Sequence, residues 1–309
     1  MKRIISILIT ILFVISAFGC SKEQEPLDLY SVMIVDGSKS IASADTKKIP
    51  SFSMAEKSYI NENLTKEKTL TIGDTVYEAT YKESISAPFV GIGEVDVYMD
   101  ANKDIELGFS SDDASLLRII SNDPTRPIVS FSETITSESQ YITWLNPVVE
   151  KFLKVDLSDY IFECQTHVKG GETKNGFIVD TPNSDIEVVF YSIEYAKYTN
   201  NNRVIDRIRA LISSNGDVTT IVRADLRIKD DSIIEIDETK LDNSIDKTLK
   251  DMYSDSKYDL ISYEISEEIL KIYDNNIFLV CGISLKLSHK KETLSSKIIL
   301  AVNLTSNIT

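Results

Sequence analysis

Apolar and polar residues alternate along much of the chain after Thr69, as they do in β-strands that bury one face. The alternation is clear over residues 95–99 and 105–109. The turn residues 110–113 then lead into the apolar run 116–120. This order predicts a β-hairpin, because polar turn residues separate two strands of similar pattern.

The strand pattern returns in the second half of the chain. Asn215-Gly216 lies between two apolar runs and is the strongest hairpin signal present, because these residues accept the positive φ angles of a two-residue turn. We expect strands at 160–168, 186–191, 205–212, 218–228, 258–265, 269–273, 277–287 and 296–304.

Two segments show the helical period instead. In residues 137–154, Ser137 and Gln140 have the spacing of a capping box. Pro147 should kink this helix or mark its true start, because proline removes one backbone hydrogen bond. Its apolar face would consist of Tyr141, Leu145, Val148, Val149 and Phe152. The second helix is expected at 237–253, with Leu241, Ile245, Leu249 and Met252 on its apolar face.

The elements around the two predicted helices follow a similar order. Each helix comes after a hairpin and before further strands, and the offset between matching segments drifts along the chain. We interpret this order as a duplicated unit with changed loops. The alternative is that any chain of mixed helices and strands yields such pairings by chance.

The N-terminus has the layout of a secretory signal. Two basic residues precede the apolar run 4–18, which is shorter than the roughly 20 residues of a membrane-spanning helix. Ala17, Phe18 and Gly19 followed by Cys20 resemble the bacterial lipobox. That resemblance implies that Cys20 becomes the acylated N-terminus and anchors the protein to a membrane. An uncleaved N-terminal membrane helix is the alternative.

These patterns give an α+β protein of four parts. We expect a lipoprotein signal peptide at 1–19, a flexible tether at 20–65, a first module at 66–201 and a second module at 202–309. Each module would be one helix packed on a curved antiparallel sheet.

Charge excludes one class of partner. The chain has a formal net charge of −15, with no cluster of Lys or Arg, so phosphate backbones would be repelled and nucleic acid is not expected to bind.

Cys164 and Cys281 are the cysteines of the body of the protein. Both are in phase with apolar strand residues, which predicts two buried thiols, with a disulfide between them as the alternative. Neither His167 nor His289 has a motif around it that would support a nucleophilic thiol. We therefore predict no catalytic residues.

Two further motifs are incomplete. Residues 100–104 begin like a calcium loop of the Asp-x-Asn-x-Asp type, but Ile105 replaces the required glycine and Ser111 replaces the bidentate glutamate. Gly91-Ile92-Gly93 lacks the third glycine of a nucleotide fingerprint. We expect neither a metal nor a cofactor.

A family resemblance covers roughly residues 75–305. Ser137-x-x-Gln140, the amphipathic helix, Asp156–Tyr160, the following strand and the turn on Asn-Gly resemble the PepSY-like modules of secreted Gram-positive proteins and lipoproteins. They are also similar to accessory proteins that restrain cell-wall sensor kinases. The resemblance implies a cystatin-like helix on a curved sheet, commonly in pairs. Trp144 departs from the small residue common in such helices, and no family site can be carried over.

The sequence thus predicts a lipoprotein at the extracytoplasmic face of a bacterial cell membrane, acting as a non-enzymatic binding or regulatory module of the cell envelope. A carrier of an apolar ligand or peptide and an envelope hydrolase are the alternatives. The expected partners are the membrane, through Cys20, and another envelope protein. Residues 298–304 are the candidate sheet edge for that protein, the alternative being a strand covered on both sides.

Overall fold

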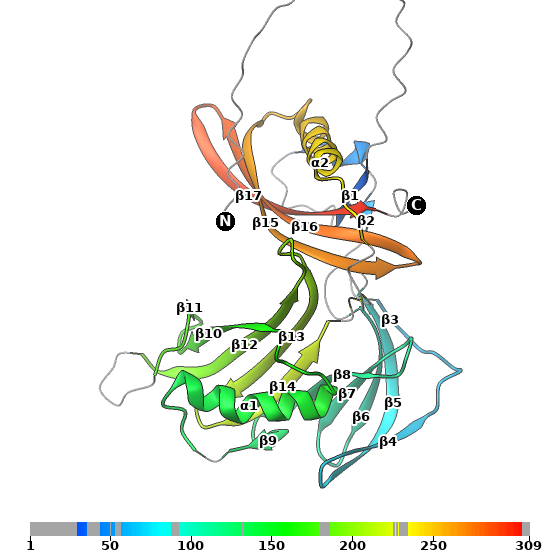
Figure 1. Cartoon of the computed structure of the whole chain (residues 1–309), viewed down its shortest axis with the longest axis vertical. Coiled ribbons are helices and arrows are strands. Elements are labelled where there is room, and N and C mark those ends of the chain that lie inside the picture. The colour runs from blue at the N-terminus through cyan, green and yellow to red at the C-terminus, as the bar shows by residue number, and fades with distance from the viewer. Residues whose placement is uncertain are drawn as a thin grey trace, which may run out of the picture. The chain divides into compact units, whose positions relative to one another are not determined.

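The computed structural model describes residues 30–35, 44–49, 51–52, 57–87, 93–131, 133–179, 186–224, 226, 228 and 234–304. Across these residues the fold is α+β, with two α-helices and strands that pair almost entirely antiparallel (Figure 1). The chain divides into two compact units, of which unit 1 takes the described parts of 1–53, 232–269 and 273–309. Unit 2 takes those of 54–231 and 270–272.

Unit 2 is a long antiparallel sheet with one helix. Its strands lie in the order β11, β10, β12, β13, β14, β8, β7, β6, β5, β4, with β3 beside the far end of β5 and β9 beside β14. The elements are β3 (Lys57–Tyr59), β4 (Glu67–Ile72), β5 (Thr75–Ala87), β6 (Gly93–Asp100), β7 (Ile105–Ser110), β8 (Leu116–Ser121), β9 (Val129–Ser130), α1 (Glu138–Leu153), β10 (Ile161–Val168), β11 (Thr173–Asn175), β12 (Val188–Tyr198), β13 (Val204–Ser213) and β14 (Asp217–Arg223).

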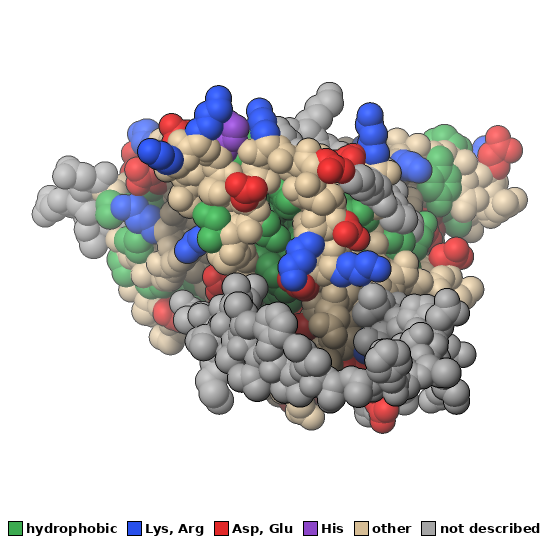
Figure 2. Space-filling model, turned by 90° about the horizontal axis from the view of Figure 1, so that it is seen from above, with side chains coloured by type: hydrophobic (Ala, Val, Ile, Leu, Met, Phe, Trp, Pro, Cys, Tyr) green, Lys and Arg blue, Asp and Glu red, His purple; other side chains and the backbone are tan. Residues whose placement is uncertain are grey.

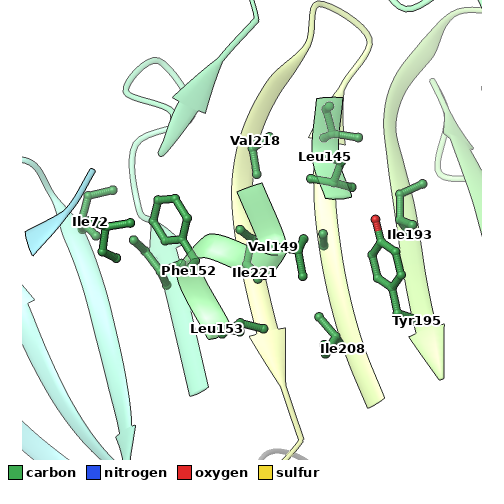
Figure 3. Close-up of a cluster of buried hydrophobic side chains, with 14 of the residues drawn as sticks. Ile72, Leu145, Val149, Phe152, Leu153, Ile193, Tyr195, Ile208, Val218 and Ile221 are labelled. Atoms are coloured by element: carbon green, nitrogen blue, oxygen red, sulfur yellow. The ribbon is translucent and has the colours of Figure 1, made fainter. Parts of the chain in front are cut away.

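Helix α1 buries its apolar face against this sheet. Leu145 and Val149 are fully buried at the centre of the contact, where they meet Ile193, Ile208 and strands on either side (Figure 3). The same apolar cluster reaches from β4 to β12, so one helix holds together strands that are far apart in the sequence. This burial is the main favourable term available to unit 2.

Sequence periodicity located both helices correctly. Ser137 is the N-cap of α1, and its hydroxyl accepts a hydrogen bond from the Gln140 N–H at 3.3 Å. The Gln140 side chain, however, accepts from the N–H of Thr136 at 3.0 Å, one residue before the position a capping box requires. The helix begins at Glu138 and runs through Pro147, so the proline does not mark its start.

Unit 1 is a smaller sheet with the second helix. Its elements are β1 (Ser31–Val35), the short 3-10 helix η1 (Thr46–Lys48), β2 (Ser51–Phe52), α2 (Glu238–Tyr253), most of β15 (Asp259–Tyr273), β16 (Asn276–His289) and β17 (Glu292–Asn303). Asp237 caps α2, and the predicted apolar face of this helix is buried. The strands expected at 258–265 and 269–273 form the single strand β15.

The predicted tether was wrong in part. Residues 31–35 of the expected tether form β1, which pairs with β17 over Ser31↔Asn303 to Val35↔Ile299. Val32, Met33, Ile34 and Val35 are buried, because a run of four apolar residues stabilises a sheet more than it stabilises a solvated linker. Part of the predicted tether is therefore core of unit 1.

The same pairing decides between the two interpretations of residues 298–304. β17 lies between β16 and β1, so the backbone of residues 299–303 has partners on both sides. The alternative stated for 298–304, a covered strand, is the one that the structure shows.

The division into units also replaces the predicted boundary at 201–202. That boundary falls in the short connection between β12 and β13, which pair from Phe190↔Ser213 to Tyr198↔Val204 and belong to one sheet. The predicted duplication is not shown, because the two units differ in the number and order of their strands.

Buried tyrosines make the fold sensitive to alkali. Burial raises the pKa of Tyr253 and of Tyr263 to about 12 and also raises those of Tyr141, Tyr160 and Tyr195. In the unfolded chain these groups lose their protons near pH 10, while the folded chain keeps them. The contribution of these tyrosines to the free energy of unfolding should therefore be constant below about pH 9, and the free energy of unfolding should fall between about pH 10 and 12. Urea unfolding followed at about pH 8, 10 and 11 checks this, and equal values at all three would contradict it.

Candidate functional site

The predicted lipidation residues lie outside the described part of the chain. This holds for Ala17, Phe18, Gly19 and Cys20, and equally for Gly91 and Ile92 of the incomplete glycine motif. Gly93 begins β6. The sequence prediction of a lipid anchor therefore stays a prediction.

A row of four paired residues on unit 2 forms the candidate site. Tyr59 of β3 is opposite Ser84 of β5, Ser84 is opposite Asp96 of β6, and Asp96 is opposite Phe109 of β7. Directly paired residues project from the same face of a sheet, so these side chains form one line across four strands. The line passes from Tyr59, which is 46% exposed, to Asp96, which is 6% exposed.

A chain of hydrogen bonds crosses this row. The Ser84 hydroxyl donates to an oxygen of Asp96 at 2.6 Å and lies 2.9 Å from the hydroxyl of Tyr81. The Tyr81 hydroxyl accepts from the N–H of Asn61 at 2.9 Å. The buried carboxylate thus has a buried donor, which offsets the cost of removing its charge from water.

Lys68 of β4 brings a positive charge to the same place. Its ammonium group lies 3.7 Å from the centre of the Phe109 ring and 5.1 Å from that of Tyr98. Burial lowers the pKa of Lys68, and the nearby Asp96 carboxylate opposes that shift. The ring faces and the carboxylate together favour the charged form of an amine that burial disfavours.

The Ser84 hydroxyl is not arranged like the nucleophile of a Ser-His-Asp triad. Its hydrogen bond goes directly to the Asp96 carboxylate, whereas in such a triad the serine donates to a histidine that an acid orients. His167 belongs to β10 and His289 to the end of β16. Tyr59 and Ile60, 46% and 65% exposed, give the row an apolar end that another molecule can touch.

The structure explains the incomplete calcium loop. Asp100 is fully buried, and its carboxylate accepts hydrogen bonds from the N–H groups of Glu78, Asn102 and Lys103 at 3.0, 3.0 and 3.1 Å. The Lys103 ammonium adds a contact at 3.3 Å. These donors outweigh burial and hold the pKa of Asp100 below its usual value, so this carboxylate organises a turn between β6 and β7.

The two cysteines and two histidines are not members of the row Tyr59, Ser84, Asp96 and Phe109. Cys164 and Cys281 are both buried, as predicted, and belong to different units. Burial raises the pKa of Cys164, which makes its thiol less reactive. The His167 ring stacks on Phe190 at 4.2 Å, and His289 contacts the carbonyl of Lys257 at 2.8 Å.

Sequence reasoning missed the row through Ser84 and Asp96. The sequence pattern identified β6 from the apolar residues Val95, Val97 and Met99 alone. The intervening residues Asp96 and Asp100 project from the opposite face and are also buried. A strand buried on both faces that still carries acids at alternate positions signals a polar cluster. The partners of those acids depend on strand register, which the chain pattern does not reveal.

Comparison with family models, with curated proteins and with solved structures finds no match to this chain. No helix within the described residues is both long and apolar enough to cross a membrane. In the same part of the chain, no three His, Cys, Asp or Glu side chains are grouped so as to hold a metal ion. On the face drawn in Figure 2, acidic and basic side chains are interspersed.

The Asp100 carboxylate should contribute measurably to stability. Asp100→Asn keeps the volume but replaces one accepting oxygen with an amide that donates, so it should lower the free energy of unfolding by about 1–3 kcal/mol at neutral pH. Because the folded pKa of Asp100 is depressed, its contribution is present above pH 3.8 and is lost as the pH falls further. Urea unfolding of the wild type and of Asp100→Asn checks this. The difference between their free energies of unfolding should be smaller at about pH 3 than at about pH 7.

Asp104→Asn is the matched control for this prediction. Asp104 lies in the same turn at a positive φ of 55°, a conformation that asparagine tolerates. It should change stability little. Equal effects of the two substitutions would contradict a special role for Asp100.

Proposed function

We propose that this chain is a lipid-anchored, extracytoplasmic lipoprotein that acts as a non-enzymatic binding or regulatory module of the cell envelope. The observation that carries the proposal is the N-terminal run ending in Ala17-Phe18-Gly19-Cys20. Acylation at Cys20 would contribute ~0.8 kcal/mol per buried methylene, and two or more chains suffice for stable anchoring.

The structural support comes from the exposed end of the candidate site. Tyr59 and Ile60 are large apolar side chains that water reaches, and behind them lies the hydrogen-bonded row of Ser84 and Asp96. A fixed apolar contact beside satisfied polar groups is the kind of surface on which protein partners dock. The binding surface proposed here is Tyr59 with Ile60, in place of the covered strand at 298–304.

We propose that α1 and α2 with their sheets are two PepSY-like, cystatin-like modules whose loops and outer strands have diverged. The support is that each helix has a side-chain N-cap and buries one apolar stripe, over Leu145 and Val149 in α1 and over Ile245 and Leu249 in α2.

The anchoring step has a direct test. In cells expressing the full chain, the protein should partition with membranes and incorporate labelled palmitate. Cys20→Ala should abolish the label and either release the body or leave an unprocessed precursor, because the acyl acceptor is gone. A wild-type protein that is soluble and unlabelled would overturn the proposal. Ser21→Ala, next to the anchor, should behave as wild type.

The binding step is tested by crosslinking intact cells and identifying the captured proteins by mass spectrometry. We expect an envelope protein, and a sensor kinase or protease would favour regulation. Tyr59→Ala with Ile60→Ser should reduce its capture at least fivefold, because both substitutions remove apolar contact area. Val189→Ser, on an exposed residue of β12, is the control and should leave capture unchanged. A copurifying lipid or peptide without any protein partner would favour the carrier, and equal capture by both variants would reject the Tyr59 surface.

A further inference from the structure

Strand β4 is an outer strand of unit 2. Among the described residues it pairs only with β5, over Glu67↔Thr80 to Ile72↔Thr75 (Figure 1). Glu67, Thr69 and Thr71 are exposed, so solvent reaches the outer face of this strand. An outer strand of this length is a template for another strand.

Strand register determines which backbone groups face outward. The N–H of Tyr81 donates to the carbonyl of Lys66 at 2.7 Å, so positions 66, 68, 70 and 72 exchange hydrogen bonds with β5. The N–H and C=O groups of Glu67, Thr69 and Thr71 therefore point away from β5. They are the groups that an added strand would bond.

The central lysine of this edge is turned inward. A lysine on an outer strand commonly blocks pairing, and β4 carries Lys68. Its ammonium group, however, is folded over Phe109 on the inner side of the sheet at 3.7 Å. The half-buried Leu70 is then the central inward residue of this edge.

The sequence of this edge is complementary to itself. In an antiparallel pair of two β4 strands centred on Leu70, Thr69 of one copy is opposite Thr71 of the other, a pairing in which the outward groups form four hydrogen bonds. Leu70 is then opposite Leu70. The same register brings Lys66 of each copy beside Asp74 of the other, and both residues are exposed.

We propose that two copies of this chain pair through their β4 edges, antiparallel and about a two-fold axis at Leu70, so that the sheet of unit 2 continues from one copy into the other. The proposal goes beyond the proposed function and does not depend on the lipid anchor, because its contacts lie entirely within unit 2. The interface would be of the self-complementary kind that two-fold symmetry requires.

Cysteine crosslinking in the full chain tests the geometry. Leu70→Cys places a thiol opposite its own copy at a non-hydrogen-bonded pair, where side chains approach most closely. Whole-cell extracts prepared without reductant should contain a disulfide-linked dimer that reductant abolishes. Val189→Cys, exposed on β12, should stay monomeric and controls for chance collision. If Leu70→Cys does not accumulate, Thr69→Cys with Thr71→Cys replaces it, since both side chains are exposed and face each other in the same register.

Charge reversal tests the register. In the Leu70→Cys background, Lys66→Asp or Asp74→Lys alone should lower the dimer fraction at least fivefold, because each places like charges together. The two reversals combined should restore it. A monomeric Leu70→Cys protein at wild-type abundance, or equal crosslinking of Leu70→Cys and Val189→Cys, would overturn the proposal. A dimer fraction that is the same in all the charge-reversal variants would overturn the assigned register.

Discussion

The burial of the apolar face of α1 against one antiparallel sheet is the constraint on which the rest of unit 2 depends. Leu145 and Val149 are fully buried between strands that come from widely separated parts of the chain. A sheet with an apolar face needs a covering layer, and here a single helix provides it. Strands from β4 to β12 must therefore keep their register, because a slip of one residue would turn apolar side chains away from the helix.

The polar groups of β6 are subject to a related constraint. Asp96 and Asp100 lie at buried strand positions, so each carboxylate needs donors within the protein. Ser84 supplies one to Asp96, and three backbone N–H groups supply Asp100. The candidate site is thus the point where this buried polar row reaches solvent at Tyr59.

The sequence was informative wherever the cause of structure is local. Ser137 and Asp237 mark the helix starts, and Asn215-Gly216 forms the turn between β13 and β14, where Gly216 has a φ of +82°. It was uninformative where the partner is distant. The strand at residues 31–35 pairs with β17, from the other end of the chain. A short apolar run in the sequence does not show whether it will pair with such a strand or remain an apolar patch in a linker. Ser84, Asp96 and Phe109 likewise become neighbours only through pairing of three strands.

Strands β17 and β4 show the same dependence on distant partners, with opposite results. β17 is apolar and would be an exposed edge, but β1 satisfies its backbone groups. β4 has a lysine that should protect it, yet the rings of Phe109 and Tyr98 and the carboxylate of Asp96 hold the Lys68 ammonium on the inner side. The Lys68 charge is thus engaged in contacts within one copy of the chain. The contact that completes the candidate site therefore keeps this ammonium group from the outer edge, where the backbone groups of Glu67, Thr69 and Thr71 point away from β5.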